Sequence, residues 1–161
     1  MHQNHTFAVH FQFMKNYTSE IKNKKAGFEY HFLNTYSAGI MLSGTEVKSI
    51  REGKANLTDA FCIFIDGDLF VKNMHISEYK QGSYSNHEPK RMRKLLLTKT
   101  ELRKIQSKLK EKGTTIIPVQ LSFNERGYAK LEIAIARGKK LFDKRESLKE
   151  KDLRRQMQRT E

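Results

Sequence analysis

The chain has 161 residues, which suits one domain with a tail at one or both ends. It carries 31 Lys and Arg residues against 18 Asp and Glu residues, a formal net charge of +13, and this excess favours a nucleic acid as the partner. No apolar run approaches the ~20 residues that span a bilayer, so we expect no membrane partner. The single Cys62 excludes an internal disulfide and fits a cytoplasmic location.

Patterning divides the chain into residues 1–22, 23–137 and 138–161. The first segment has little apolar periodicity, and we predict a leader without regular structure there. The middle segment holds most of the apolar residues and is predicted to form the folded domain. From Arg137 onward ten basic residues stand against five acidic ones, so we predict a basic tail without regular structure in the free protein.

The first half of the middle segment predicts a strand, a helix and a hairpin. Aromatic residues alternate with others over 28–32, as in a half-buried strand. Residues 43–46 (Ser-Gly-Thr-Glu) match a capping box, which begins a short helix that Gly53 can end. Asp66-Gly67 separates two apolar runs and predicts a hairpin, because both residues tolerate positive φ.

The second half begins with a predicted loop over residues 77–94, which is rich in Gly, Ser and Asn and ends in basic residues. Residues 98–101 (Thr-Lys-Thr-Glu) match a second capping box. The apolar residues of 102–109 recur at spacings of three and four, so a helix with one apolar stripe is expected there. Gly113 is expected to end this helix region.

A long hairpin is predicted on either side of the turn at residues 124–127. The apolar residues expected to share its inward face are Ile117, Val119, Leu121, Phe123, Leu131, Ile133 and Ile135. Tyr128, Lys130, Glu132 and Ala134 are then expected to face solvent. Pro118 has no amide donor, so its strand should lie at an edge or beside a bulge. Because so few antiparallel strands must hide their edges, we predict a mainly β fold, a small closed or partly open barrel with two or three flanking helices.

Few residues could support catalysis. Cys62 lies within an apolar run and is expected to be a buried hydrophobic residue. His75 and His87 could serve as the acid and base of a ribonuclease, but nothing in the sequence brings them together. After the leader, no closely spaced Cys or His pair predicts a metal site, and no glycine-rich loop predicts a phosphate cradle. We therefore expect no enzyme, no metal and no cofactor.

Basic residues give the clearest functional signal. Residues 90–94 (Lys-Arg-Met-Arg-Lys) place four positive charges in five positions, and such repulsion favours contact with phosphate. Tyr128 and Lys130 would offer an aromatic ring beside a cation, a combination suited to RNA, although a solvated lysine is an equal alternative. Phe142 lies within the basic stretch 137–145, where it could stack on a base or belong to a solvated tail.

Several short motifs of the chain resemble the SsrA-binding (SmpB) family over about residues 23–150. In chain order they are Asn23-Lys-Lys-Ala26, Gly44-Thr-Glu-Val-Lys-Ser49, Gly53-Lys-Ala-Asn56, Asn73-Met-His-Ile76, Arg93-Lys-Leu-Leu-Leu97, Ala136-Arg-Gly-Lys-Lys140 and Asp143-Lys-Arg145. The resemblance implies an oligonucleotide-binding (OB)-type β-barrel that binds the tRNA-like domain of tmRNA and delivers it to stalled ribosomes. It further implies a tail that enters the decoding centre and the empty mRNA path, where it becomes helical. The implied partners are tmRNA, the small-subunit rRNA and, through tmRNA, elongation factor Tu.

The resemblance also implies site residues. Those expected to contact RNA from the barrel are Lys24, Lys25, Glu46, Lys48, Asn73, His75, Arg91, Arg93, Lys94, Leu96 and Lys130. Those expected at the decoding centre are Gly138, Lys139, Lys140, Phe142, Asp143, Lys144 and Arg145. Many relatives have Glu at the position of Ser37 and some have Asn at that of Thr98, so their specific hydrogen bonds do not transfer. A ribosomal or ribosome-assembly protein would share the charge and size, and is the alternative function.

Overall fold

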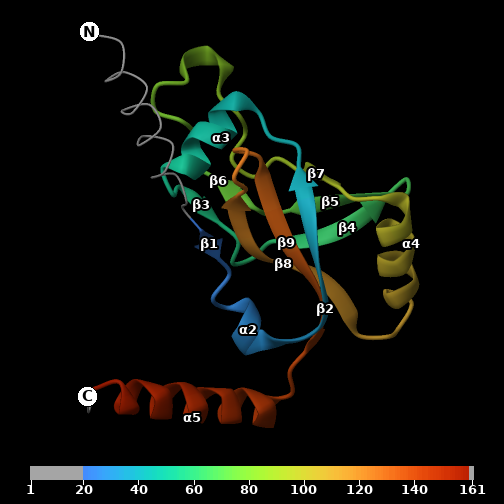
Figure 1. The fold of residues 1–161 in the computed structure, drawn as a ribbon, viewed down its shortest axis with the longest axis vertical. Helices are drawn as coiled ribbons and strands as arrows, with labels where there is room; N and C mark the ends of the chain where they lie inside the picture. Colours follow the sequence, from blue (N-terminus) through green and yellow to red (C-terminus); the bar gives the residue numbers. More distant parts are fainter. Residues whose placement is uncertain (1–19, 160–161) are drawn as a thin grey trace, which may run out of the picture.

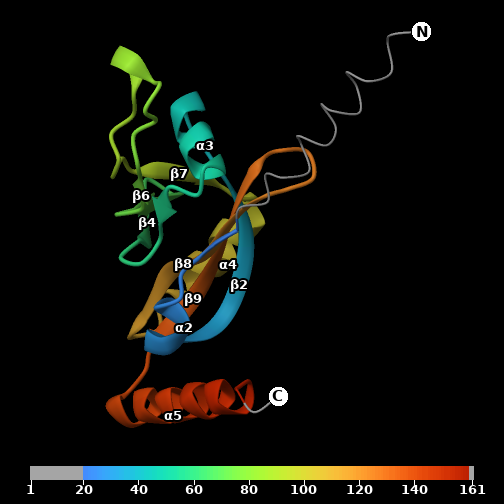
Figure 2. The same ribbon diagram turned by 90° about the vertical axis from the view of Figure 1, so that its left-hand side faces the viewer.

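The protein forms a β-barrel with helices around it, and its structure, a computed structural model, describes residues 20–159 (Figures 1 and 2). Among these residues the elements are β1 (Ile21–Lys22), α2 (Ala26–Glu29), β2 (Tyr30–Ile40), α3 (Gly44–Arg51), β3 (Ala55–Asn56), β4 (Phe61–Ile65), β5 (Asp68–Lys72), β6 (His75–Ile76), η1 (Ser83–Ser85), β7 (Arg93–Leu96), α4 (Lys99–Lys108), β8 (Thr114–Phe123), β9 (Ala129–Gly138) and α5 (Leu141–Met157).

The main sheet closes into a ring. Its strands follow the order β1-β8-β4-β5-β7-β2-β9, and β9 pairs with β8 to complete the circle. All of these pairings are antiparallel, so closure hides the edges that an open sheet would expose. The short strands β3 and β6 form a separate pair. The interior is filled by apolar side chains from every strand of the ring, Leu69 and Ile133 among them. The predicted mainly β, barrel-like fold is confirmed.

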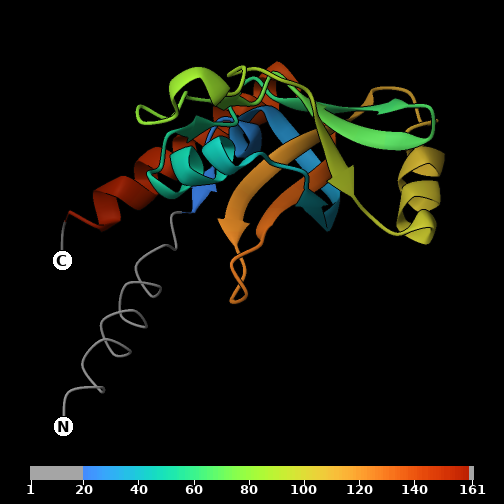
Figure 3. The same ribbon diagram turned by 90° about the horizontal axis from the view of Figure 1, so that it is seen from above.

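Short sequence motifs correctly predicted where two of the helices begin and where the chain turns between strands. Both capping boxes are present, at the starts of α3 and α4. Asp66 and Gly67 have φ values of 50° and 83°, so both turn residues between β4 and β5 adopt the left-handed conformation. The predicted hairpin of β8 and β9 is also present, and Figure 3 shows its turn projecting beyond the rest of the sheet.

The beginning of the domain differs from the prediction. The leader was expected to extend to residue 22, but Ile21 and Lys22 form β1 and pair with β8; residues 1–19 lie outside the described part. Phe28 belongs to α2 and not to the predicted strand over 28–32, because the chain turns into a helical segment directly after Asn23. A register shift in β2 beside Phe32 then breaks the simple alternation that was predicted.

The predicted inward face of the β8–β9 hairpin is wrong in part. A register shift between Pro118 and Gln120 marks a bulge, as the proline predicted, and it turns the first part of β8 over. Ile117 therefore packs in a second cluster outside the barrel interior, with Ala26 of α2 and Ala134. Ala134 was expected to face solvent, but α2 covers this patch and leaves it fully buried.

The C-terminal segment is helical in the structure. Leu141–Met157 forms the continuous helix α5, and disorder of this segment in the free protein stays a prediction. The helix lies at the end of the molecule where α2 is found, and it projects away from the barrel (Figures 1 and 2). Between residues 143 and 157 every side chain is at least partly exposed, in agreement with the prediction that this segment cannot bury itself. Charged side chains of high helix propensity account for the helical conformation.

Candidate nucleic-acid interface

Two of the predicted RNA-binding residues lie in one row across the outside of the barrel. Gly39 of β2 stands opposite Leu96 of β7 on one side and opposite Lys130 of β9 on the other. Lys130 in turn stands opposite Ser122 of β8. Because directly opposed residues of neighbouring strands point to the same face, these four positions form one continuous row, the strand row. Leu96 is 51% exposed in it, although it follows a buried strand residue.

Gly39 is the member of the strand row that the sequence did not single out as a contact. A Cβ atom built at Gly39 would lie 3.2 Å from Cβ of Leu96, so the missing side chain gives Leu96 its space. It also leaves bare backbone at the centre of the row, where another chain can approach closely. The available signal was a glycine inside a strand pattern, which often marks such an approach.

Exposed apolar and aromatic side chains lie near the strand row and its cation, Lys130. Met41 and Tyr128, each two residues along the chain from a row member, are 52% and 67% exposed. A hollow of about 190 Å³ adjoins Lys130, with Ser37 in its lining. Exposed apolar and aromatic side chains beside cations offer bases a surface to stack on and phosphates a counter-charge. This face can therefore bind single-stranded or unstacked RNA.

Two predicted RNA contacts are instead buried, which corrects the reading of residues 90–94. Arg93 and Glu46 are both fully buried. The Arg93 Nε donates to Glu46 at 2.7 Å, and its other nitrogens donate to the carbonyl oxygens of Met74, Pro89 and Arg91. Arg91 also donates to Glu46, at 2.7 Å from Nη2. Neither Arg93 nor Glu46 is available to RNA in this structure.

Two carboxylates offset part of the charge of this basic run within the protein. Glu46 serves both arginines, and Lys94 pairs with Asp68 at 2.9 Å. Burial alone would raise the pKa of Glu46, but hydrogen bonds from Arg91, from the Ser43 amide and from Arg93 lower it to about 2. Carboxylates of the protein itself therefore relieve part of the repulsion that suggested phosphate contact. The sequence could not show this, because Glu46 lies 45 residues before Arg91.

A second group of predicted residues lies around a hollow of about 420 Å³, at the β3–β6 side of the barrel. Asn73, His75 and Lys90 line it together with Asn56 and Asp59. Asn73 has a φ of 58°, which turns the chain sharply between β5 and β6. The group brings donors, acceptors and one exposed lysine together.

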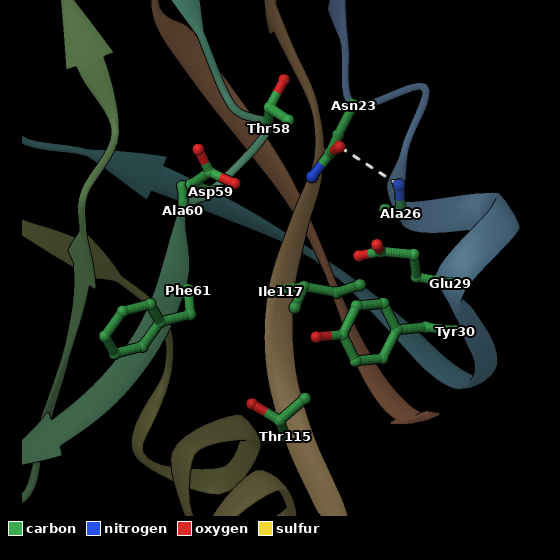
Figure 4. A pocket seen from close by; sticks show the side chains of 10 residues that line it. All are labelled: Asn23, Ala26, Glu29, Tyr30, Thr58, Asp59, Ala60, Phe61, Thr115 and Ile117. Carbon is green, nitrogen blue, oxygen red and sulfur yellow. Dashed lines mark hydrogen bonds between the residues drawn. The ribbon is translucent and has the colours of Figure 1, made fainter. Parts of the chain in front are cut away.

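Lys24 and Lys25 are both exposed beside a neighbouring pocket of about 290 Å³. Lys25 pairs with Glu29 and Asp59, at 3.7 Å in each case. Asn23 in the same lining is buried: its amide donates to the carbonyl oxygens of Leu57 and Pro118 and accepts from Ala26 (Figure 4). Asn23 therefore clamps the start of α2 onto the barrel.

The remaining barrel residues are scattered. Lys48 is exposed on α3, with its ammonium 5.3 Å from the ring centre of Tyr79. His87 is buried, with Nε2 3.0 Å from the Ile76 carbonyl and Nδ1 2.9 Å from the Thr45 hydroxyl. These bonds occupy both ring nitrogens, so His87 is not free to act as an acid or base with His75. Cys62 is buried as predicted, and burial raises the pKa of its thiol.

The predicted decoding-centre residues link the barrel to α5. Lys139 donates from its amide to the Glu29 carbonyl and from Nζ to the Gly27 carbonyl, so it attaches the tail to α2. Asp143 lies 3.5 Å from His31 of β2. Gly138 ends β9, Lys140 precedes α5, and Lys144 and Arg145 lie in its first turns. Phe142 lies in this helix, and its side chain is outside the described part.

Comparison with known proteins bears on what this surface binds. A model of the SmpB protein family matches residues 20–161. The chain belongs to the SmpB family. An SsrA-binding protein of Phocaeicola vulgatus is 60% identical over 146 residues, which cover 91% of this chain and 97% of the relative. The SsrA-binding protein of Bacteroides thetaiotaomicron gives the same values.

A solved structure also matches. The chain from a study of tmRNA–SmpB at the centre of the bacterial ribosome superposes with a TM-score of 0.67 and is 48% identical, over 80% of this chain and 94% of that one. The family resemblance seen in the sequence motifs is therefore confirmed, and the relatives are described as binding proteins rather than enzymes. Within residues 20–159, no helix is both long and apolar enough to cross a membrane.

Proposed function

We propose that this chain binds the tRNA-like domain of tmRNA and accompanies it to stalled ribosomes for trans-translation. Membership of the SmpB family and the names of its relatives support this function. The strand row carries the proposal: an exposed Leu96, the bare backbone of Gly39 and the cation of Lys130 lie side by side across three strands. Leu96 would pack against a base or sugar, and Lys130 would neutralise a phosphate.

The tail would have a separate task within the same function. We propose that residues 138–145 and the helix after them occupy the decoding centre and the empty mRNA path, against small-subunit rRNA. Lys140, Lys144 and Arg145 are at least partly exposed and precede or begin α5, which supports contact with phosphates. Elongation factor Tu would be reached only through the bound tmRNA.

Binding tests the first part. Lys130→Ala should weaken binding to a tRNA-like-domain RNA and make its salt dependence shallower by about one unit, because one phosphate contact is lost. Lys72→Ala, which removes an exposed lysine at the end of β5, is the matched control and should behave as wild type. Equal behaviour of the two variants would remove Lys130 from the interface. Recovery of rRNA without tmRNA from cells would favour the ribosome-assembly alternative.

Truncation tests the separation of tasks. A chain ending at Gly138 keeps every strand of the barrel and the whole strand row. It should bind the tRNA-like domain almost as well as the full chain but fail to support peptide transfer on a reconstituted stalled ribosome. Loss of tmRNA binding by a truncated chain that is still folded would show that the tail contributes to the first interface.

A further inference from the structure

Helix α4 carries a basic surface that the strand row does not include. Its apolar side, formed by Leu102, Ile105 and Leu109, packs into the barrel core. The opposite side and the turn after it expose five cations, which are Lys99, Arg103, Lys104, Lys110 and Lys112. We call these five residues the α4 basic face.

The cations of the α4 basic face lack close acidic partners. None of the five forms an ion pair with a carboxylate in the part of the chain that the structure describes. Lys104 acts on Glu101 only through its charge. The two acidic residues of this segment have other partners: Glu101 caps the helix with Thr98, and Glu111 pairs with Arg137. This differs from residues 90–94, where Arg91 and Arg93 share Glu46 and Lys94 pairs with Asp68.

The α4 basic face lies next to the strand row. Leu96 of the row is separated from the start of α4 by only Leu97 and Thr98, and Figure 1 shows the helix beside β2. Farther along α4, Lys108 donates to Asn34 of β2, so the helix follows the strand that holds Gly39. Hydrogen bonds from the Thr98 amide and hydroxyl lower the pKa of Glu101, and the charges of Lys104 and Lys130 also lower it.

We propose that the α4 basic face binds the phosphodiester backbone of the same tRNA-like RNA that the strand row contacts. This inference rests on the proposed function and extends its interface. The row would hold one unstacked part of the RNA, and the helix would follow the backbone beside it. The ten residues of α4 extend for about 15 Å along the helix axis, long enough to meet more than one phosphate. Unlike the row, it presents no exposed large apolar side chain, so it would add affinity without reading bases.

The test compares two triple variants with equal loss of charge. Arg103→Gln/Lys104→Gln/Lys110→Gln removes three cations from the α4 basic face. Lys22→Gln/Lys72→Gln/Lys80→Gln removes three exposed cations that lie outside the α4 basic face, the strand row and the tail, and each variant lowers the net charge from +13 to +10. Glutamine keeps a high helix propensity, so thermal unfolding should confirm that both variants are folded. Affinity for a synthetic tRNA-like domain is then measured at several salt concentrations, with wild type and Lys130→Ala alongside.

We expect the α4 variant to bind roughly tenfold more weakly at low salt and its salt dependence to be shallower by about two to three units, with the control variant unchanged. Equal effects of the two variants would overturn the proposal, because only net charge would then matter. Normal RNA binding by the α4 variant, with weakened binding to ribosomes, would also overturn it and assign the face to rRNA. If Lys130→Ala weakens binding and the α4 variant does not, only this inference fails. If the wild-type protein does not bind the tRNA-like RNA, the proposed function fails.

Discussion

Glu46 offers the sharpest test of how the barrel holds its shape. Its carboxylate is fully buried and accepts hydrogen bonds from the Ser43 amide and from two arginines, one of which is also fully buried. Glu46→Gln keeps the size and one acceptor of the side chain but removes its charge. Arg93 then keeps a buried positive charge with no carboxylate beside it. Removal of one partner of a buried ion pair costs about 3–5 kcal/mol.

The pH dependence gives an independent magnitude. Glu46 has a pKa of about 2 in the folded protein against an ordinary value of 4.5. Because one pKa unit corresponds to about 1.4 kcal/mol, the ionised carboxylate contributes about 3 kcal/mol to the free energy of unfolding. A lowered folded-state pKa means that this contribution is present above pH 4.5 and is lost as the pH falls towards 2. Both estimates are a large part of the 5–15 kcal/mol that stabilises a typical domain.

Urea unfolding followed by circular dichroism, repeated between pH 7 and about pH 2.5, measures both quantities. Glu46→Gln should be about 3 kcal/mol less stable than wild type at pH 7, and the difference should shrink as the pH falls. Glu150→Gln, which neutralises an exposed carboxylate on α5, is the control and should follow wild type. A difference between Glu46→Gln and wild type that stayed constant with pH would refute the role given to the carboxylate charge.

Three further substitutions test other contacts. Asn23→Ala should destabilise the barrel by about 1–3 kcal/mol in urea unfolding, because the buried partners of its side-chain amide lose their hydrogen bonds. Gln106→Ala, at an exposed position, is the control, and equal stability of the two variants would show that Asn23 does not hold α2 on the barrel. Gly39→Ala should weaken RNA binding while thermal unfolding changes little, since the new methyl group meets Leu96; unchanged affinity would mean that RNA does not approach there. Asp143→Asn should loosen α5 from β2, seen as faster amide exchange in α5, and unchanged exchange would show that the His31 pair does not hold the helix.

Structural features that depend on neighbouring residues were predicted from the sequence, and features that depend on residues distant in the chain were not. Capping boxes, the Asp66-Gly67 turn and the bulge at Pro118 depend on neighbouring residues, so their patterns predicted them. The burial of Arg93 could not be predicted in this way, because its partner Glu46 comes from a distant helix. The covered face of Ala134 was missed for a similar reason, since α2 reaches it from the other end of the domain.

The candidate site was predicted in unequal parts. Lys130 and Leu96 were named from motifs, and the registers then brought them together on either side of Gly39. No pattern in the sequence relates those two strands, because register between strands remote in the chain depends on the whole ring. The α4 cations were visible in the sequence, but only the structure shows that the acidic residues near them are already paired.

The closure of the ring bears on how the protein is made. β2 is among the first strands synthesised, yet its main partner is β9, with Tyr30 opposite Gly138 at a separation of 108 residues. Its other partner, β7, offers only two paired positions. An emerging chain must therefore carry β2 without its main strand partner until nearly all of the domain has been translated, so we expect the ring to close late in synthesis. A copy cut short before β9 would have an open ring and an unprotected strand edge, the kind of product that aggregates or is degraded.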